Sequence, residues 1–285
     1  MGMGEAYITM ADDGFAAYWN PAKSFNAGHC LALAHARYFG SLVTHDAIGY
    51  TKPMGDYALG LIYLRLAVSD IPYTDQALID LNHNGIMDPG ERIDYTRITF
   101  NDDVESALLI NYGRHHESGL CWGLNLKMAH KSLGPNSAWG MGLDAGISGD
   151  WQSRLRLGVS LQDITTTYIA WDNGTRELVY PTIRTGASYH PLIAGSRPLT
   201  LAIGGDIRLE GRGSAANFNA GDISLDLKAG LEYWLKNRIA ARLGSDQGRF
   251  TAGAGLKVGR LRFDYGYMAH QYLDGSSRLS GSFLF

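Results

Sequence analysis

The sequence predicts an all-β protein, an antiparallel transmembrane β-barrel of about 14 strands with a separate N-terminal segment. Three observations carry this prediction. Apolar and polar residues alternate with a period of two from about residue 30 to the C-terminus. Glycine accounts for 36 of the 285 residues and tyrosine for 16, but proline for only 8, a composition typical of short strands joined by tight turns. No stretch approaches about 18 uncharged apolar residues, which excludes a transmembrane helix.

The alternation is clearest in residues 222–234, where one face is apolar and the other is charged, polar or glycine. Side chains of a strand point alternately to its two faces, so this segment has one apolar and one polar surface. Fourteen segments of this kind are expected as strands: 30–39, 42–52, 55–68, 103–114, 118–130, 138–149, 152–163, 182–191, 197–209, 221–234, 237–245, 248–258, 259–269 and 275–285.

The connections between these segments sort by length. Those after even-numbered strands are short, and the long ones, 69–102, 164–181 and 210–220, all follow odd-numbered strands. Bacterial outer-membrane barrels have short periplasmic turns and longer outer loops. We therefore expect an outer-membrane protein with both termini in the periplasm. No cleavable signal peptide is visible, so the chain is either cytosolic or numbered from a mature N-terminus after signal removal.

The polar face of the strands carries both charges and many glycines, which suits a crowded interior better than bulk water. We expect this face to line the lumen and its charges to form a structural network rather than a substrate site. The expected lumenal charges are Arg154, Arg156, Asp206, Arg208, Asp226, Glu232, Arg260, Arg262 and Asp264, with Arg242 beside them. The net charge of -3 gives no basic excess, so no nucleic-acid partner is expected.

The first 29 residues do not alternate and carry a resemblance to a known family. The run GMGEAYITMADDGFAAYWNPA is similar to the opening of PorV/PorQ-like proteins, within the FadL-type outer-membrane transporter superfamily. The matching features are Gly2-Met3-Gly4, Ala6-Tyr7, Ala11-Asp12-Asp13 and Ala17-Tyr18-Trp19-Asn20-Pro21-Ala22. The chain departs from the pattern at Lys23, where the family often continues with Gly-Leu, and it is compact for the family.

The resemblance implies that residues 1–29 form a hatch inside a barrel of residues 30–285, with Asn20, Pro21 and Ala22 as its motif. Physical reasoning agrees, because a barrel of about 14 strands is wider than its own side chains fill. A disordered periplasmic tail is the alternative, and it would leave the large side chains Phe15 and Trp19 in water.

Residues 80–91, DLNHNGIMDPGE, fit the calcium-loop pattern D-x-[DN]-x-[DN]-G-x5-E. The expected ligands of Ca2+ are Asp80, Asn82, Asn84, the backbone carbonyl of Ile86, Asp88 and Glu91. The ion would order the outer insertion 69–102. A turn rich in Asn, Asp and Gly that needs no ion is the alternative.

No nucleophile motif or metal-binding histidine spacing is present, so no enzyme activity is expected. Cys30 and Cys121 are expected to be free thiols on strands that are not neighbours. The terminal aromatic Phe285 resembles the signal that outer-membrane barrels present to the barrel assembly machinery.

Two functions remain open. FadL-type barrels transport small hydrophobic molecules, and the segment 55–68, apolar on both faces around Gly60, suits either a wall opening or packing against a plug. PorV-like proteins instead act with the type IX secretion system, as partners or as anchors for a surface-filament assembly without conduction. Both functions place the chain among outer-membrane lipids. A soluble β-sandwich or barrel is disfavoured, because it has no reason to sort its loops by length.

Overall fold

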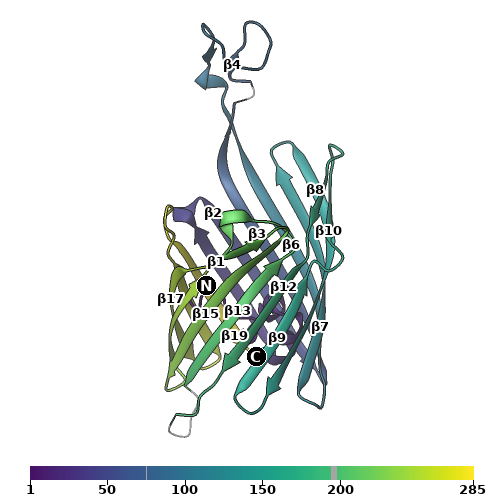
Figure 1. Ribbon diagram of the computed structural model, residues 1–285, viewed down its shortest axis with the longest axis vertical. Coiled ribbons are helices and arrows are strands. Elements are labelled where there is room, and N and C mark those ends of the chain that lie inside the picture. Colours follow the sequence, from purple (N-terminus) through teal and green to yellow (C-terminus); the bar gives the residue numbers. More distant parts are fainter. Residues whose placement is uncertain (75, 194–197) are drawn as a thin grey trace.

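The computed structural model describes residues 1–74, 76–193 and 198–285. Within these ranges the chain forms a closed antiparallel β-barrel with 14 strand positions (Figure 1). The barrel closes where β1 (Cys30–Tyr38) pairs with β19 (Ser276–Leu284), and β1 pairs on its other side with β2 (Val43–Met54). The predicted antiparallel barrel of 14 strands is therefore confirmed.

Each of the fourteen predicted segments contains an observed strand. The other strands of the barrel wall are β3 (Tyr57–Tyr73), β6 (Thr99–His115), β7 (Leu120–Leu133), β8 (Asn136–Trp151), β9 (Leu155–Gln162), β12 (Thr182–Tyr189), β13 (Leu199–Arg208), β15 (Ile223–Leu235), β16 (Ile239–Asp246), β17 (Arg249–Val258) and β18 (Leu261–Met268). Strands β3 and β6 are longer than expected, because they keep pairing with each other above the wall as far as Tyr73 and Thr99.

This longer ribbon shortens the predicted insertion 69–102 to a connection over 74–98, of which residue 75 lies outside the described residues. We call residues 76–98 the tip. It contains β4 (Leu78–Ile79), β5 (Arg92–Ile93) and the 3-10 helix η3 (Tyr95–Arg97), and β4 pairs with β5. Figure 1 shows the tip standing clear of the rest of the barrel.

The segment 164–181, expected to be an outer loop, is instead mostly a hairpin of β10 (Thr167–Trp171) and β11 (Arg176–Val179). Strand β10 pairs with β8, so it continues the line of β9 after a break at residues 163–166. Asp163 and Thr166 have positive φ angles of 55° and 56°, which interrupts the extended backbone there. Thr167–Trp171 alternates as a strand does, but its 5 residues are too few to distinguish a strand from a loop in the sequence.

The two faces of the wall have the polarity that the alternation predicted. On β15, Ile223, Leu227 and Tyr233 are exposed on the outside, while Asp226 on the other face is buried in the lumen. The aromatic residues Trp139 and Tyr265 also lie exposed on the outer surface. An apolar exterior around a polar interior is the arrangement of a membrane barrel.

The long connections lie at one rim of the barrel and short turns at the other, as the sequence predicted. The short-turn rim holds 55–56, 116–119, 152–154, 236–238 and 259–260. The predicted turn 192–196 lies mostly outside the described residues. The long-loop rim holds the tip and residues 209–222, with η2 (Phe39–Ser41), η4 (Gly213–Ala215) and β14 (Phe218–Ala220). Among the described residues, no helix has the length and apolar character needed to cross a membrane.

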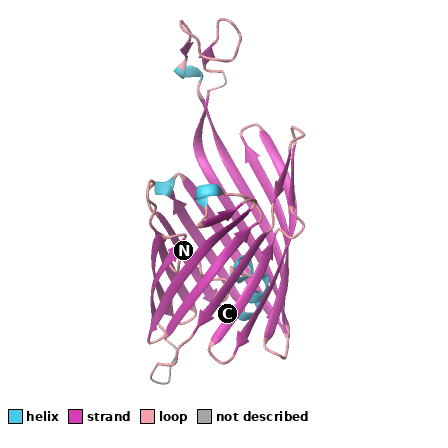
Figure 2. Ribbon diagram, in the orientation of Figure 1, coloured by secondary structure: helices cyan, strands magenta, loops and turns pink. Residues whose placement is uncertain are grey.

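The N-terminal residues lie inside the barrel, where they form α1 (Ala16–Trp19) and the 3-10 helix η1 (Pro21–Ala27). Figure 2 shows these helices enclosed by the strands. The two termini occupy different places: Phe285 donates its backbone N–H to His29 at the short-turn rim, whereas Met1 lies in the lumen against Gly266 of β18.

Candidate functional site

The lumen is occupied by residues 1–27, which we call the N-terminal segment. It lies so close to the wall that glycine is required at the points of contact. A β-carbon on Gly123 would overlap the carbonyl oxygen of Pro21, and one on Gly146 would overlap the Asn20 side chain. The wall glycines that meet the segment are Gly49, Gly113, Gly123, Gly146, Gly158, Gly186, Gly230, Gly244, Gly253 and Gly266. The predicted glycine-lined interior is therefore present.

The motif residues Asn20, Pro21 and Ala22 are fully buried, with Asn20 against β8 and β9 and the Pro21–Ala22 backbone also against β6 and β7. The Asn20 amide donates to the backbone carbonyl oxygens of Ile147, at 3.0 Å, and Val159, at 3.4 Å. Its side-chain oxygen accepts from the Ala22 N–H at 3.0 Å and so caps η1. Proline suits the first position of that helix, because its missing N–H is not needed there. Asn20 therefore fixes the turn and attaches it to the wall at once.

A ladder of buried amides and a carboxylate continues this attachment along the wall. Asn111 of β6 donates to the Pro21 carbonyl oxygen at 3.1 Å and to Asn125 of β7 at 2.7 Å. Asn125 donates to the Ala17 carbonyl oxygen at 3.0 Å and to Asp144 of β8 at 3.3 Å. Each residue of this ladder has 2% or less of its surface exposed, so a lost bond would leave a buried polar group unpaired.

The ladder ends at the break between β9 and β10. Asp144 accepts from the Asp163 N–H at 2.9 Å, and Lys127 lies 3.2 Å from Asp144 and 2.5 Å from the Asp163 carboxylate. Sequence reasoning did not single out this ladder. The available signal was a set of polar residues at the lumenal positions of otherwise apolar strands.

Most predicted lumenal charges line the interior and are paired. Lys228 lies 2.7 Å from Asp206, and Arg242 lies 2.7 Å from Glu232. The remaining pairs are Arg262 with Asp264 at 2.8 Å, Arg184 with Asp206 at 3.5 Å, Arg208 with Asp226 at 3.9 Å, and Arg212 with Asp226. Arg262 also lies 2.8 Å from Asp12, so the network reaches the N-terminal segment.

Two of the predicted lumenal charges are elsewhere, and a third lies near the rim. Arg154 and Arg260 are exposed in turns of the short-turn rim, because β9 and β18 begin only at Leu155 and Leu261, later than the predicted starts at 152 and 259. Arg156 lies near the same rim, 2.6 Å from Asp150.

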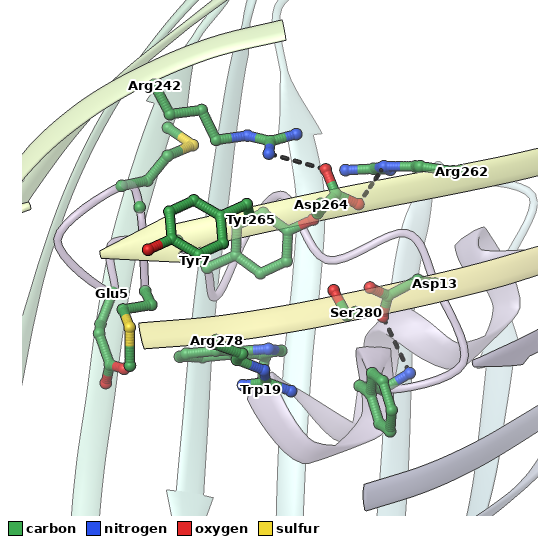
Figure 3. Close-up of a pocket in the computed structure, with 15 residues that line it drawn as sticks. Glu5, Tyr7, Asp13, Trp19, Arg242, Arg262, Asp264, Tyr265, Arg278 and Ser280 are labelled. Atoms are coloured by element: carbon green, nitrogen blue, oxygen red, sulfur yellow. Dashed lines mark hydrogen bonds and ion pairs between the residues drawn. The ribbon is translucent and has the colours of Figure 1, made fainter. Parts of the chain in front are cut away.

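Two cavities adjoin the N-terminal segment, with volumes of about 80 and 300 Å3. Both are lined by Glu5, Phe15, Trp19 and Arg278. The smaller one extends to the pairs of Arg242 and Arg262 with Asp264 (Figure 3). The larger one is lined mainly by aromatic and aliphatic side chains: Tyr18, Tyr38, Leu64, Leu66, Ala107 and Ala129.

Strand β3 shows no opening to the membrane. Gly60 is in register with Thr51 of β2 and with Asn111 of β6, and pairing continues on both sides. The inward side chain of Ile62 is fully buried in a cluster with Phe15. Packing against the N-terminal segment therefore accounts for the second apolar face of β3.

The predicted calcium loop is closely wound. The Asp80 carboxylate accepts from the His83 N–H at 2.6 Å and from the Gly85 N–H at 2.7 Å. The side chains of Asn82 and Asn84 each donate to Asp88 at 2.7 Å.

Glu91 closes the same loop, because its carboxylate accepts from the N–H groups of Leu81 and Asp88, each at 2.9 Å. The backbone N–H of Gly85 holds the pKa of Asp80 below its usual value. Across the described ranges, no three His, Cys, Asp or Glu side chains are grouped to hold a metal, so any calcium site here would also draw on the asparagine and backbone oxygens.

Cys30 and Cys121 are both free thiols, as predicted, and both are buried. Cys121 lies at the start of β7, with its sulfur 3.4 Å from His115 Nδ1 and 3.9 Å from the Asn26 side-chain oxygen. The N-terminal segment therefore contributes to the cover of this thiol.

No family model matches the chain, and no curated protein matches its sequence. Solved structures do match its fold. The P. putida toluene transporter TodX has a TM-score of 0.64 and 11% identity, over 93% of this chain and 92% of that one. The Ralstonia pickettii toluene transporter TbuX has a TM-score of 0.59 and 11% identity, over 100% and 97%.

A Pseudomonas aeruginosa FadL homologue has a TM-score of 0.58 and 12% identity, over 99% of this chain and 96% of that one. Identities this low show that the folds are alike, but they do not show a shared function. The fold of the chain is thus the FadL type, a 14-strand antiparallel barrel.

Proposed function

We propose that the chain is a bacterial outer-membrane protein that passes small hydrophobic molecules through its lumen, with residues 1–29 as a movable hatch. The observation that carries the proposal is the buried N-terminal segment with an apolar, aromatic-lined cavity beside it. Apolar pockets with a few polar groups are the usual form of small-molecule sites. The FadL-type fold, shared with toluene transporters, supports the same function.

The geometry of the segment supports a part that moves. It is held by hydrogen bonds and close packing, and its attachment at Asn20 is polar rather than covalent. Burial of Phe15 and Trp19 stabilises the docked state by roughly 1.5–3 kcal/mol each. In the bilayer, the short-turn rim would face the periplasm and the tip would face outward, as in other outer-membrane barrels.

A reversible cross-link tests whether the segment must move. Ser24 Cβ lies 3.6 Å from the position that a β-carbon on Gly113 would take, which is within the range of a disulfide. We expect the variant Ser24→Cys/Gly113→Cys, with Cys30 and Cys121 replaced by alanine, to pass ethylbenzene only when reduced, in liposomes whose outer leaflet is lipopolysaccharide, because that leaflet slows the direct entry of hydrocarbons. The matched control is Gly113→Cys alone in the same background, which carries the same added side chain without the cross-link and should pass ethylbenzene under both conditions.

Two results of this experiment would contradict the proposal. Equal passage by the oxidised and reduced forms would show that the segment does not act as a hatch. No passage of ethylbenzene by the wild-type protein, in liposomes that contain folded barrels, would overturn transport itself.

We also propose that residues 80–91 bind Ca2+ through Asp80, Asn82, Asn84, Ile86, Asp88 and Glu91. The wound loop supports this, because hydrogen bonds already join Asn82 to Asp88 and Asp80 to the backbone of a tight turn at Gly85. The ion would stabilise the tip rather than take part in passage.

A second candidate function is that of a partner in type IX secretion or an anchor for a surface filament. One observation favours it: the tip and the top of the β3–β6 ribbon stand beyond the barrel and expose Leu81, Ile86, Met87, Tyr95 and Phe100. Exposed apolar groups of this kind mark interaction sites. Recovery of a secretion component in a fixed ratio with this chain from native outer membrane, lost on deletion of 76–98, would support this function over transport.

A further inference from the structure

The wall shared by the two lumenal cavities contains a cation without an anionic partner. Arg278 is half-buried on β19, and its guanidinium carbon lies 5.5 Å from the centre of the Phe15 ring. No ion pair or hydrogen bond joins this guanidinium to any described residue. Nearly every other arginine in the lumen has a carboxylate within ion-pair distance, as Arg242 and Arg262 do.

A carboxylate without a partner lies on the other component of the same wall. Glu5 belongs to the N-terminal segment, and the cationic groups that act on it are the Met1 amino group, which acts most strongly, and the side chains of Lys228, Arg184 and Arg278. Lys228 and Arg184 already lie 2.7 and 3.5 Å from Asp206. Figure 3 draws Glu5 and Arg278 together and marks no ion pair or hydrogen bond between them.

The backbone of Glu5 supports a positioned side chain. Its φ angle is 58°, a conformation that costs energy for a residue with a side chain. Such residues persist where surrounding structure holds them, and they cluster at ligand sites. The close contact of Gly4 with β16 holds this turn of the segment in place.

The other charges of the larger cavity cancel. Lys131 lies 2.8 Å from Glu105, so both are paired. The space therefore offers one separated positive and one separated negative group and no net charge. A buried nitrogen of His45, Nδ1, also has no partner within the described chain and adds a polar contact.

The rest of the lining is apolar and rich in aromatic rings. Phe15, Trp19, Tyr18 and Tyr38 contribute rings from the segment and from β1, and Leu64 contributes from β3. An apolar molecule with one charge would leave either Glu5 or Arg278 without a counter-charge in a water-poor space, which is costly. A neutral hydrocarbon would leave both groups without a counter-charge.

We propose that these cavities bind a small zwitterion with an apolar body, its carboxylate at Arg278 and its ammonium group at Glu5. The body packs against Phe15 and Trp19. This inference rests on the proposed function, since the cavities lie on the proposed path, and it narrows the class of molecule that the lumen selects.

Four ligands with a phenyl ring on a short chain test the proposal: phenylalanine, 3-phenylpropanoate, phenethylamine and ethylbenzene. Calorimetry on the full chain in detergent should give the tightest binding for phenylalanine. Arg278→Gln should weaken phenylalanine and 3-phenylpropanoate by about tenfold and leave phenethylamine unchanged, since one charge-assisted contact is lost. Glu5→Gln should weaken phenylalanine and phenethylamine by a similar factor and leave 3-phenylpropanoate unchanged.

Arg37→Gln is the matched control. Arg37 lies on β1 in register with Ser277, next to Arg278, but its side chain is exposed on the outside of the wall. This variant should bind all four ligands as the wild-type protein does. A loss at Arg37→Gln equal to that at Arg278→Gln would show a general effect of charge and overturn the proposal.

The outcomes also separate this inference from the proposed function. Binding of ethylbenzene as tight as that of phenylalanine, or equal weakening of all four ligands by Arg278→Gln, would overturn the zwitterion site. Passage of ethylbenzene into liposomes in that case would leave the proposed function standing. Charge-dependent binding of phenylalanine, with no passage of any of the four, would support the site and overturn transport.

Discussion

The N-terminal segment and the tip are both irregular regions of a barrel protein, but different contacts hold them. The side chain of Asn20 in the segment bonds to Ile147, 127 residues away, and Asn125 reaches back 108 residues to Ala17. In the tip, Glu91 bonds to Leu81, 10 residues away, and Asp80 to Gly85, 5 residues away. Contacts with the barrel wall determine the shape of the N-terminal segment, whereas hydrogen bonds within the tip determine the shape of the tip.

This difference has a mechanical consequence. A region held by the wall changes when the wall changes, so the segment can sense or be displaced by what enters the lumen. A region held by its own loop responds only to what binds that loop. Perturbations of the two regions should therefore be independent, because sites far apart without shared partners usually contribute additively.

The largest effect is expected from Gly123→Ala. A β-carbon at this position would overlap the Pro21 carbonyl oxygen and crowd the Ala22 nitrogen, and backbone atoms of a buried motif cannot move cheaply. Overpacking of this kind costs about 1–3 kcal/mol, which shifts the docking equilibrium by roughly 5–150-fold. Maleimide labelling of the native thiol of Cys121 should accelerate by a similar factor.

Gly149→Ala is the control for this prediction. A β-carbon on Gly149 of β8 would lie 3.4 Å from Leu120 Cδ1, an ordinary contact, so labelling of Cys121 should stay at the wild-type rate. If Gly123→Ala labels no faster than Gly149→Ala, close packing against the wall does not hold the segment.

Asn20→Ala should have the next largest effect. It removes the cap on Ala22 and the bonds to Ile147 and Val159, and leaves a buried N–H without its partner. Such losses cost about 1–3 kcal/mol. Protease should then cleave the N-terminal segment faster than in Asn26→Ala, which removes an exposed side chain of the same helix. Equal cleavage of the two variants would show that packing alone holds the N-terminal segment in the lumen.

The same contrast explains what the sequence alone predicted. Period-two alternation is local, so strand positions, face polarity and the sorting of loops followed from it. The pattern of residues 80–91 is also local, so the calcium-loop hypothesis followed from the sequence alone. The contacts of Asn111, Asn125 and Asp144 with the segment join strands far apart in the chain, and no spacing rule connects them. The position of Arg278 beside Glu5 is of this second kind, because it depends on how the segment folds back across the lumen.

The tip should respond to calcium and leave the segment undisturbed. Trypsin sites at Arg92 and Arg97 lie in the tip. Millimolar Ca2+ should slow cleavage there, since extracellular calcium sites have dissociation constants of about 0.1–1 mM. A chelator should restore cleavage without changing the labelling of Cys121. Glu91→Ala should abolish the calcium effect.

Asp94→Ala offers a control within the tip. The Asp94 carboxylate caps η3 through Thr96 and lies outside the loop 80–91, so the calcium effect should persist in this variant. Cleavage at the same rate with and without Ca2+ in the wild-type protein would assign the loop to a turn that needs no ion.

The smallest effect is expected from pH, and it concerns Asp80. The N–H of Gly85, with those of His83, Asn84 and Asn82, holds the pKa of Asp80 below its usual value of about 3.9. A group whose folded pKa is lowered stabilises the fold fully above its unfolded pKa, and this contribution is lost as the pH falls through the folded pKa. Calcium protection of the tip should thus be constant from pH 8 to about pH 5 and decline only below about pH 4. At neutral pH, Asp80→Asn should show the weak protection that the wild-type protein shows in acid. A decline that begins well above pH 5 would overturn the role given to Asp80.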